Sequence, residues 1–96
     1  MHPRKSAAWQ HQLDDRILEY LHREGWGSPD LMAAAPEFDA SEGRIGERCQ
    51  MLVFAGMVAP LHADMYELTN WGQLYLDGDL DAGHQPVSTV DRVLRG

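Results

Sequence analysis

The stretch from Ser41 to Val58 constrains the fold most strongly, because it joins a capped helix directly to a strand. The Ser41 hydroxyl can accept a hydrogen bond from one of the first free N–H groups of a helix. An apolar stripe at helical spacing follows, made of Ile45, Cys49 and Leu52. Gly56 comes after the last apolar turn, where a left-handed residue ends a helix at little cost. We therefore predict a helix of about three turns over residues 41–55 that runs into a strand at residues 57–59.

Length and cysteine content limit the chain to one small domain. Its 96 residues are near the small end of what folds alone, and a hydrophobic content of 44% can supply a core. The lone Cys49 cannot form an internal disulfide and fits a reducing cytoplasm, which is the location we predict. No run approaches the ~20 apolar residues of a membrane span, and no apolar run follows Arg4 and Lys5, so we expect neither a span nor a signal peptide.

The charge balance restricts the possible partners in two opposed ways. The formal net charge is −7, and acidic surface repels phosphate, which argues against a nucleic-acid partner. An acidic surface with a single lysine, Lys5, is also typical of proteins from salt-loving organisms, where the Debye length shortens to ~3 Å at 1 M salt. In that case the positions of the few arginines matter more than the net charge.

Two further helices are predicted before Ser41. The first spans Trp9 to Glu24, with an apolar face of Trp9, Leu13, Ile17, Leu18 and Leu21. Its opposite, polar face consists of Asp14, Asp15, Arg16, Glu19 and Arg23. Ser28-Pro29 opens a second, short helix that Pro36 stops, because a capping hydroxyl is followed by proline at the first helical position. Residues 36–40 make the turn, so the second and third helices form a helix-turn-helix.

The part of the chain after Gly56 predicts a β-hairpin and a fourth helix. Residues 57–61 and 65–68 are short apolar-rich runs around His62-Ala63-Asp64, with Pro60 near the end of the first strand. Thr69 caps a fourth helix that reaches Leu76, and residues 88–95 have the pattern of a short tail helix. The fold class predicted is α+β, mainly α: a winged helix-turn-helix with a three-helix core, a short β-hairpin wing, a fourth helix and a C-terminal tail helix. The domain spans residues 9–82, between a flexible N-terminal arm (1–8) and the tail (83–96).

Several short motifs in this order resemble a known family. They are residues 14–21, Ser28-Pro29, the Arg48-Cys49 pair with Leu52, Gly56-Met57-Val58, residues 66–69, Gly72 and residues 75–82. The chain resembles the haloarchaeal winged-helix proteins related to the repressor of the halobacterial phage phi-H. The resemblance implies a winged helix-turn-helix fold, binding of double-stranded DNA and transcriptional control in a halophilic cytoplasm.

The residues expected to face DNA follow from the inward stripe of the third helix. Steps of 100° per residue place Gly43, Arg44, Glu47, Gln50 and Met51 outward. Arg44 can read guanine or bind a phosphate, Gln50 can read adenine, and Glu47 can accept from a cytosine amine. Two glycines of the same helix, Gly43 and Gly46, weaken it by roughly 1 kcal/mol each relative to alanine. Arg48 lies at the flank of the stripe, where an ion pair within the fold is favoured over a DNA contact.

Three more residues complete the predicted DNA-binding set. Ser28 and Ser41 stand at helix N-termini, where backbone N–H groups suit a phosphate, and capping is their alternative role. His62 in the hairpin loop can meet a DNA backbone or minor groove, or stay an exposed side chain without a partner. The other histidines, His2, His11, His22 and His84, have no metal-ligand spacing.

Two functions from different classes remain open. The first is a repressor-like transcriptional regulator that binds duplex DNA as a homodimer through helix 41–55 and wing 57–68. The second is a protein-interaction module of the same fold without DNA binding, which uses the acidic face, Trp9, Trp71 and the tail. No paired base and nucleophile, metal cluster or Gly-rich phosphate loop indicates an enzyme, so we expect no catalytic residues, cofactor, metal or small-molecule ligand.

Overall fold

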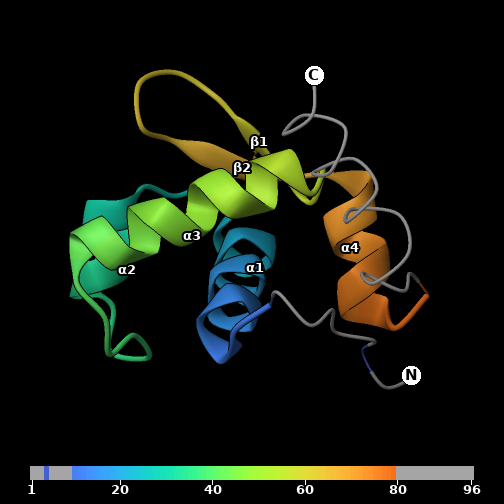
Figure 1. Cartoon of the computed structure of the whole chain (residues 1–96), viewed down its shortest axis with the longest axis horizontal. Coiled ribbons are helices and arrows are strands. Elements are labelled where there is room, and N and C mark those ends of the chain that lie inside the picture. The colour runs from blue at the N-terminus through green and yellow to red at the C-terminus, as the bar shows by residue number, and fades with distance from the viewer. Residues whose placement is uncertain (1–3, 5–9, 80–96) are drawn as a thin grey trace.

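Four helices and one hairpin make up the part of the chain that the computed structural model describes, which is Arg4 and residues 10–79 (Figure 1). The elements in chain order are α1 (Gln12–Glu24), α2 (Pro29–Ala34), α3 (Glu42–Phe54), β1 (Val58–Pro60), β2 (Tyr66–Leu68) and α4 (Asn70–Asp77). This order confirms the predicted winged helix-turn-helix, α+β and mainly α. The predicted tail helix and Trp9 lie outside the described residues. No helix within the described residues is both long and apolar enough to cross a membrane.

Two of the predicted helix starts are confirmed by their hydrogen bonds. Ser41 Oγ accepts from the N–H of Arg44 at 3.2 Å, and Thr69 Oγ1 accepts from the N–H of Gly72 at 3.1 Å. The start of α1 is later than predicted, at Gln12, because His11 has extended backbone angles and is the residue before the helix. At its other end, α3 stops as expected before Gly56, whose φ of 82° lies in the left-handed region.

The core lies between α1, α3 and the hairpin. Helix α1 runs beneath α3 and also contacts α4 and β2, so it is the element around which the others pack (Figure 1). The residues with no exposed surface come from all four helices and from Met57 just before β1, and they include Ile17, Leu18, Met32, Ile45, Cys49, Leu52, Met57 and Tyr75. The predicted inward stripe of α3 is therefore confirmed, because its three members are fully buried.

The hairpin is short and is extended by a third piece of backbone. Its strands are antiparallel, and Val58 pairs with Leu68 while Pro60 pairs with Tyr66. Tyr66 also exchanges two backbone hydrogen bonds with Gly27, at 2.8 and 3.0 Å, so the segment between α1 and α2 pairs with β2. This pairing attaches the hairpin to the helical core.

Gly72 allows α4 to pack closely against the hairpin. A Cβ atom at this position would lie 2.3 Å from the carbonyl oxygen of Met57 and 2.5 Å from a methyl carbon of Leu68. Glycine is weakly helix-forming, and the sequence alone suggests only a small loss of helix stability here. The structure gives the physical reason for the glycine, since any side chain would collide with backbone.

Candidate nucleic-acid interface

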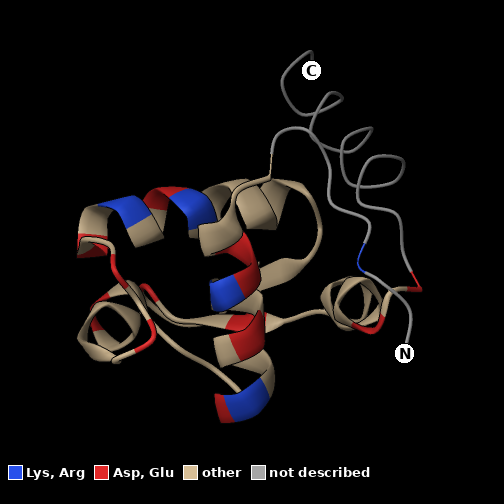
Figure 2. Cartoon of the chain, turned by 90° about the horizontal axis from the view of Figure 1, so that it is seen from below, with Lys and Arg blue, Asp and Glu red and all other residues tan. Residues whose placement is uncertain are grey.

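The outer face of α3 is polar and open to solvent. Arg44, Glu47 and Gln50 are exposed, Gly43 is exposed beside them, and Met51 is half-buried. This arrangement confirms the predicted orientation of the helix, because the opposite stripe is buried in the core. Acidic and basic residues alternate along α3, as Figure 2 shows. Hydrogen-bond donors and acceptors are therefore both available on this face.

Arg48 is held by an ion pair inside the fold, as predicted. Its Nε donates to Oδ1 of Asp14 and its second terminal nitrogen donates to Oδ2, both at 2.8 Å. Two parallel bonds of this kind are the strongest pairing that arginine makes with a carboxylate. The pairing raises the pKa of Arg48 through the hydrogen bonds from Asp14, so the guanidinium keeps its charge at any ordinary pH. Because its charge is neutralised here, Arg48 is a structural residue that joins α1 to α3.

The placement of Asp14 on the polar face of the first helix was wrong. Asp14 has no exposed surface. It stands three, four and seven residues before Ile17, Leu18 and Leu21, which puts its side chain on the buried face. A buried carboxylate needs a partner, and Arg48 on α3 provides it. The helical spacing from Ile17, Leu18 and Leu21 indicates the buried face, but the charge of Asp14 led to its assignment to the polar face.

Cys49 lies beside this pair and is a buried thiol. Burial, with a smaller contribution from the Asp14 carboxylate, raises the pKa of Cys49 to about 12. The thiolate is the nucleophilic form of cysteine, so this side chain is inert in the folded protein. The inward, packed position predicted for Cys49 is confirmed.

Arg44, one turn before Arg48, is placed differently. Within the described part of the chain its guanidinium contacts His11 and forms no ion pair with a carboxylate. The distance from Arg44 to Nδ1 of His11 is 3.5 Å. Sequence reasoning missed His11, because 33 residues separate the pair and no local spacing connects them.

Of the six predicted contact residues, four lie together on α3 and at its start. Ser41, Arg44, Glu47 and Gln50 are all exposed. His62 is exposed in the loop between β1 and β2, next to Ala63, which has a positive φ of 58°. The sixth residue is Ser28, which directly precedes α2.

Ser28 is buried and does not cap α2 in the predicted way. Its hydroxyl donates to Oδ1 of Asp30 at 2.5 Å and accepts no bond from the backbone of the helix. The Asp30 carboxylate accepts this hydrogen bond, and the bond is the main reason that the pKa of Asp30 is lowered. Any contact of this region with a phosphate would therefore have to come from backbone groups rather than from the hydroxyl.

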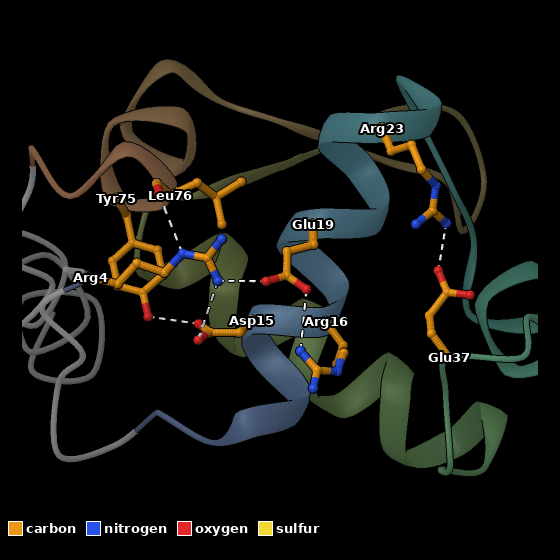
Figure 3. A network of polar contacts seen from close by, with 8 residues as sticks. All are labelled: Arg4, Asp15, Arg16, Glu19, Arg23, Glu37, Tyr75 and Leu76. Carbon is orange, nitrogen blue, oxygen red and sulfur yellow. Dashed lines mark hydrogen bonds and ion pairs between the residues drawn. The ribbon is translucent and has the colours of Figure 1, made fainter. Parts of the chain in front are cut away.

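Arg4 belongs to the predicted flexible arm, and its guanidinium is bound to α1 and α4 (Figure 3). It donates to Glu19 at 2.5 Å and to the carbonyl oxygen of Leu76 at 3.3 Å, and it lies 3.7 Å from Asp15. The hydroxyl of Tyr75 donates to the same Asp15 at 2.6 Å. These contacts use the charge of Arg4 to join α1 to α4, so this charge is already neutralised by acids of the fold.

Comparison with known proteins assigns the chain to a class and then to a family. The order of its elements is that of the winged helix-turn-helix proteins. No protein-family profile and no curated protein matches the sequence. The crystal structure of the PhiH1 repressor-like protein from Haloarcula marismortui does match, with 35% sequence identity and a TM-score of 0.87, over 88% of this chain and 97% of that one. The chain belongs to the family of PhiH1 repressor-like proteins, which confirms the family predicted by resemblance.

Proposed function

We propose that this protein is a repressor-like transcriptional regulator that binds double-stranded DNA through α3 and the hairpin that follows it. The observation that carries the proposal is the outer face of α3, where Arg44 and Gln50 are exposed while the opposite face is packed in the core. An exposed helix of a helix-turn-helix enters the major groove with its N-terminal residues near the base edges. Arg44 is in that part of α3.

Each exposed side chain of α3 has a chemical role in this proposal. Arg44 can donate two hydrogen bonds to a guanine or bind a phosphate, and Gln50 can form two hydrogen bonds with N6 and N7 on the major-groove edge of an adenine. Glu47 accepts from the amino group of a cytosine, which is the one base edge that favours a carboxylate. Ser41 and the first N–H groups of α3 face a phosphate, and His62 lies in the wing loop where it can approach the backbone.

The acidic composition is compatible with DNA binding at high salt. The structural neighbour comes from Haloarcula marismortui, and we infer that this chain also works in concentrated salt in a cytoplasm. At 1 M salt the Debye length is ~3 Å, so the net charge of −7 is screened and only groups in direct contact decide the affinity. We further propose a homodimer on a two-fold DNA site, because helix-turn-helix proteins commonly bind two half-sites related by symmetry.

The test is a fluorescence-polarisation titration in 1 M KCl. Duplexes selected by the protein from a random-sequence pool are compared with unselected duplexes, for the wild type, Arg44→Ala and Arg16→Ala. Loss of one charge-assisted contact, to a base edge or to a phosphate, costs about 1–3 kcal/mol, so Arg44→Ala should weaken binding roughly 5- to 150-fold. Arg16 is an exposed arginine of α1 paired with Glu19, and its replacement should leave the affinity unchanged. Equal affinity for selected and unselected DNA, or an Arg44→Ala variant as strong as the wild type, would refute the proposal.

A second candidate function is a protein-interaction module of the same fold. It is favoured by two large apolar side chains on α4, Trp71 and Leu74, which are 40% and 39% exposed and lie one helical turn apart. This alternative predicts no DNA affinity at any salt concentration and a heteromeric partner that Trp71→Ala no longer retains. The mass of the wild-type protein in 1 M KCl distinguishes a homodimer from a monomer.

A further inference from the structure

The start of α1 lies beside the proposed DNA-binding face of α3. The clearest contact is between Arg44 and Nδ1 of His11, 3.5 Å apart, and both side chains are exposed. Beside this contact, Asp14 accepts from the backbone N–H of His11 at 3.0 Å and binds Arg48, one turn after Arg44. One buried carboxylate therefore joins the backbone at the start of α1 to α3, the two elements that carry His11 and Arg44.

The chemistry of the pair suits a shared anion better than a bond between its members. A guanidinium can only donate, so Nδ1 of His11 must accept and the ring proton must lie on Nε2. A length of 3.5 Å is at the outer limit of hydrogen bonding, so little is lost when the contact opens. When the ring is protonated, both of its nitrogens donate, and two cationic donors then stand next to each other.

We propose that His11 and Arg44 together bind one phosphate of the DNA backbone, so that protonation of His11 strengthens DNA binding. This inference rests on the proposed function, and it adds to it a contact from α1 and a dependence on pH. Nitrogen donors 3.5 Å apart can each bond an oxygen of the same phosphate, and bonds between ionised partners are about twice as strong as neutral ones.

The sign of the pH dependence follows from the charges around His11. The charged groups at this junction are Arg44, Glu47 and Arg48 from α3 and Asp14 from α1, and the Glu47 carboxylate acts on Arg48. Asp14 and Arg48 neutralise each other, so a phosphate bound directly by His11 and Arg44 adds an anion next to the imidazole and favours its charged form. DNA binding is then accompanied by uptake of a proton by His11, and the affinity rises as the pH falls.

The experiment measures DNA affinity at pH 8.0 and pH 5.5 for the wild type and three variants. The wild type should bind roughly three- to tenfold more tightly at pH 5.5 than at pH 8.0, well below the limit of tenfold per pH unit that uptake of one proton sets. His11→Gln should lose this gain, and its plot of log affinity against log salt at pH 5.5 should be shallower by about one ion. His11→Lys should bind tightly at both pH values, because a lysine keeps its charge. His22→Gln is the matched control, an exposed histidine at the other end of α1, and should behave as the wild type.

The outcomes separate this inference from the function on which it rests. A wild-type protein that binds no DNA at either pH overturns both. Sequence-specific binding with the same pH dependence in His11→Gln as in the wild type overturns the role of His11 alone. His11 is exposed, so urea unfolding of each variant should match the wild type and exclude an effect through folding.

Discussion

Replacing Asp14 by Asn tests whether a single ion pair sets the position of α3. The carboxylate has no exposed surface and accepts three hydrogen bonds, two from Arg48 at 2.8 Å and one from the N–H of His11 at 3.0 Å. Asparagine has the same shape and one carbonyl oxygen, so it can keep the bond from His11. It cannot neutralise Arg48, and its NH₂ group would face the guanidinium, where both groups can only donate hydrogen bonds.

The magnitude follows from the burial of the two partners. Removing one member of a buried ion pair costs about 3–5 kcal/mol, because an uncompensated charge is left behind. The Arg48 side chain keeps 13% of its surface exposed, so water relieves part of this penalty. We therefore expect Asp14→Asn to lower the free energy of unfolding by about 3 kcal/mol, a large part of the roughly 5–10 kcal/mol available to a domain of this size.

The assay is urea unfolding followed by tryptophan fluorescence in 0.1 M and 1 M KCl. Glu19→Gln is the control, since it removes exposed ion pairs with Arg4 and Arg16 that contribute about 0–1 kcal/mol and weaken with salt. The loss in Asp14→Asn should be nearly the same at both salt concentrations. Adding Arg48→Met to Asp14→Asn should recover part of the stability, because the unpaired charge is then absent. A loss below about 1 kcal/mol, or no recovery in the double variant, would refute the reasoning.

Two further predictions concern packing around the same helices. Gly72→Ala should lower the free energy of unfolding by about 2–3 kcal/mol, because its Cβ would lie 2.3 Å from the carbonyl oxygen of Met57. Gly43→Ala, whose Cβ would meet nothing within 4 Å, should raise the free energy of unfolding by about 0.5–1 kcal/mol in the same urea titration. Similar effects of the two substitutions would contradict the idea that α4 packs closely on the hairpin at Gly72. Cys49, with its pKa raised to about 12, should react with a thiol reagent at pH 8 only on unfolding. An unfolded cysteine thiol ionises near pH 8.5, whereas Cys49 in the folded protein ionises near pH 12. The free energy of unfolding should therefore fall as the pH rises from about 8.5 toward 12, because only the unfolded chain releases the thiol proton in this range. Cys49→Ala should lack this decline.

The elements of this fold could be predicted because their signals are local. Ser41 and Thr69 cap the helices that follow them, and Gly56 ends α3 in the left-handed conformation, each through contacts within a few residues. The inward stripe of α3 follows from the helical repeat alone. Together with the short strands around His62, these signals were sufficient for the winged helix-turn-helix.

The junction between α1 and α3 could be predicted only in part, because its members are far apart in the chain. The sequence favoured an ion pair for Arg48, but the partner, Asp14, is 34 residues away. Charged residues usually lie on the solvent side of a helix, and this general rule predicted the wrong face for Asp14. His11 gave no signal of its own, since its position beside Arg44 depends on how the two helices pack.

The two arginines of α3 differ in whether their charge is available to a partner such as the proposed DNA. Arg44 and Arg48 are one turn apart and carry the same charge, but Asp14 neutralises Arg48 and leaves Arg44 exposed. Glu42 and Glu47 flank Arg44 on the same helix, so this face has no net positive charge to attract DNA from a distance. In the function proposed here, affinity comes from direct contacts by Arg44, Gln50 and, when protonated, His11. A surface that neutralises so few phosphates releases few counterions, so the proposed binding loses little affinity in concentrated salt.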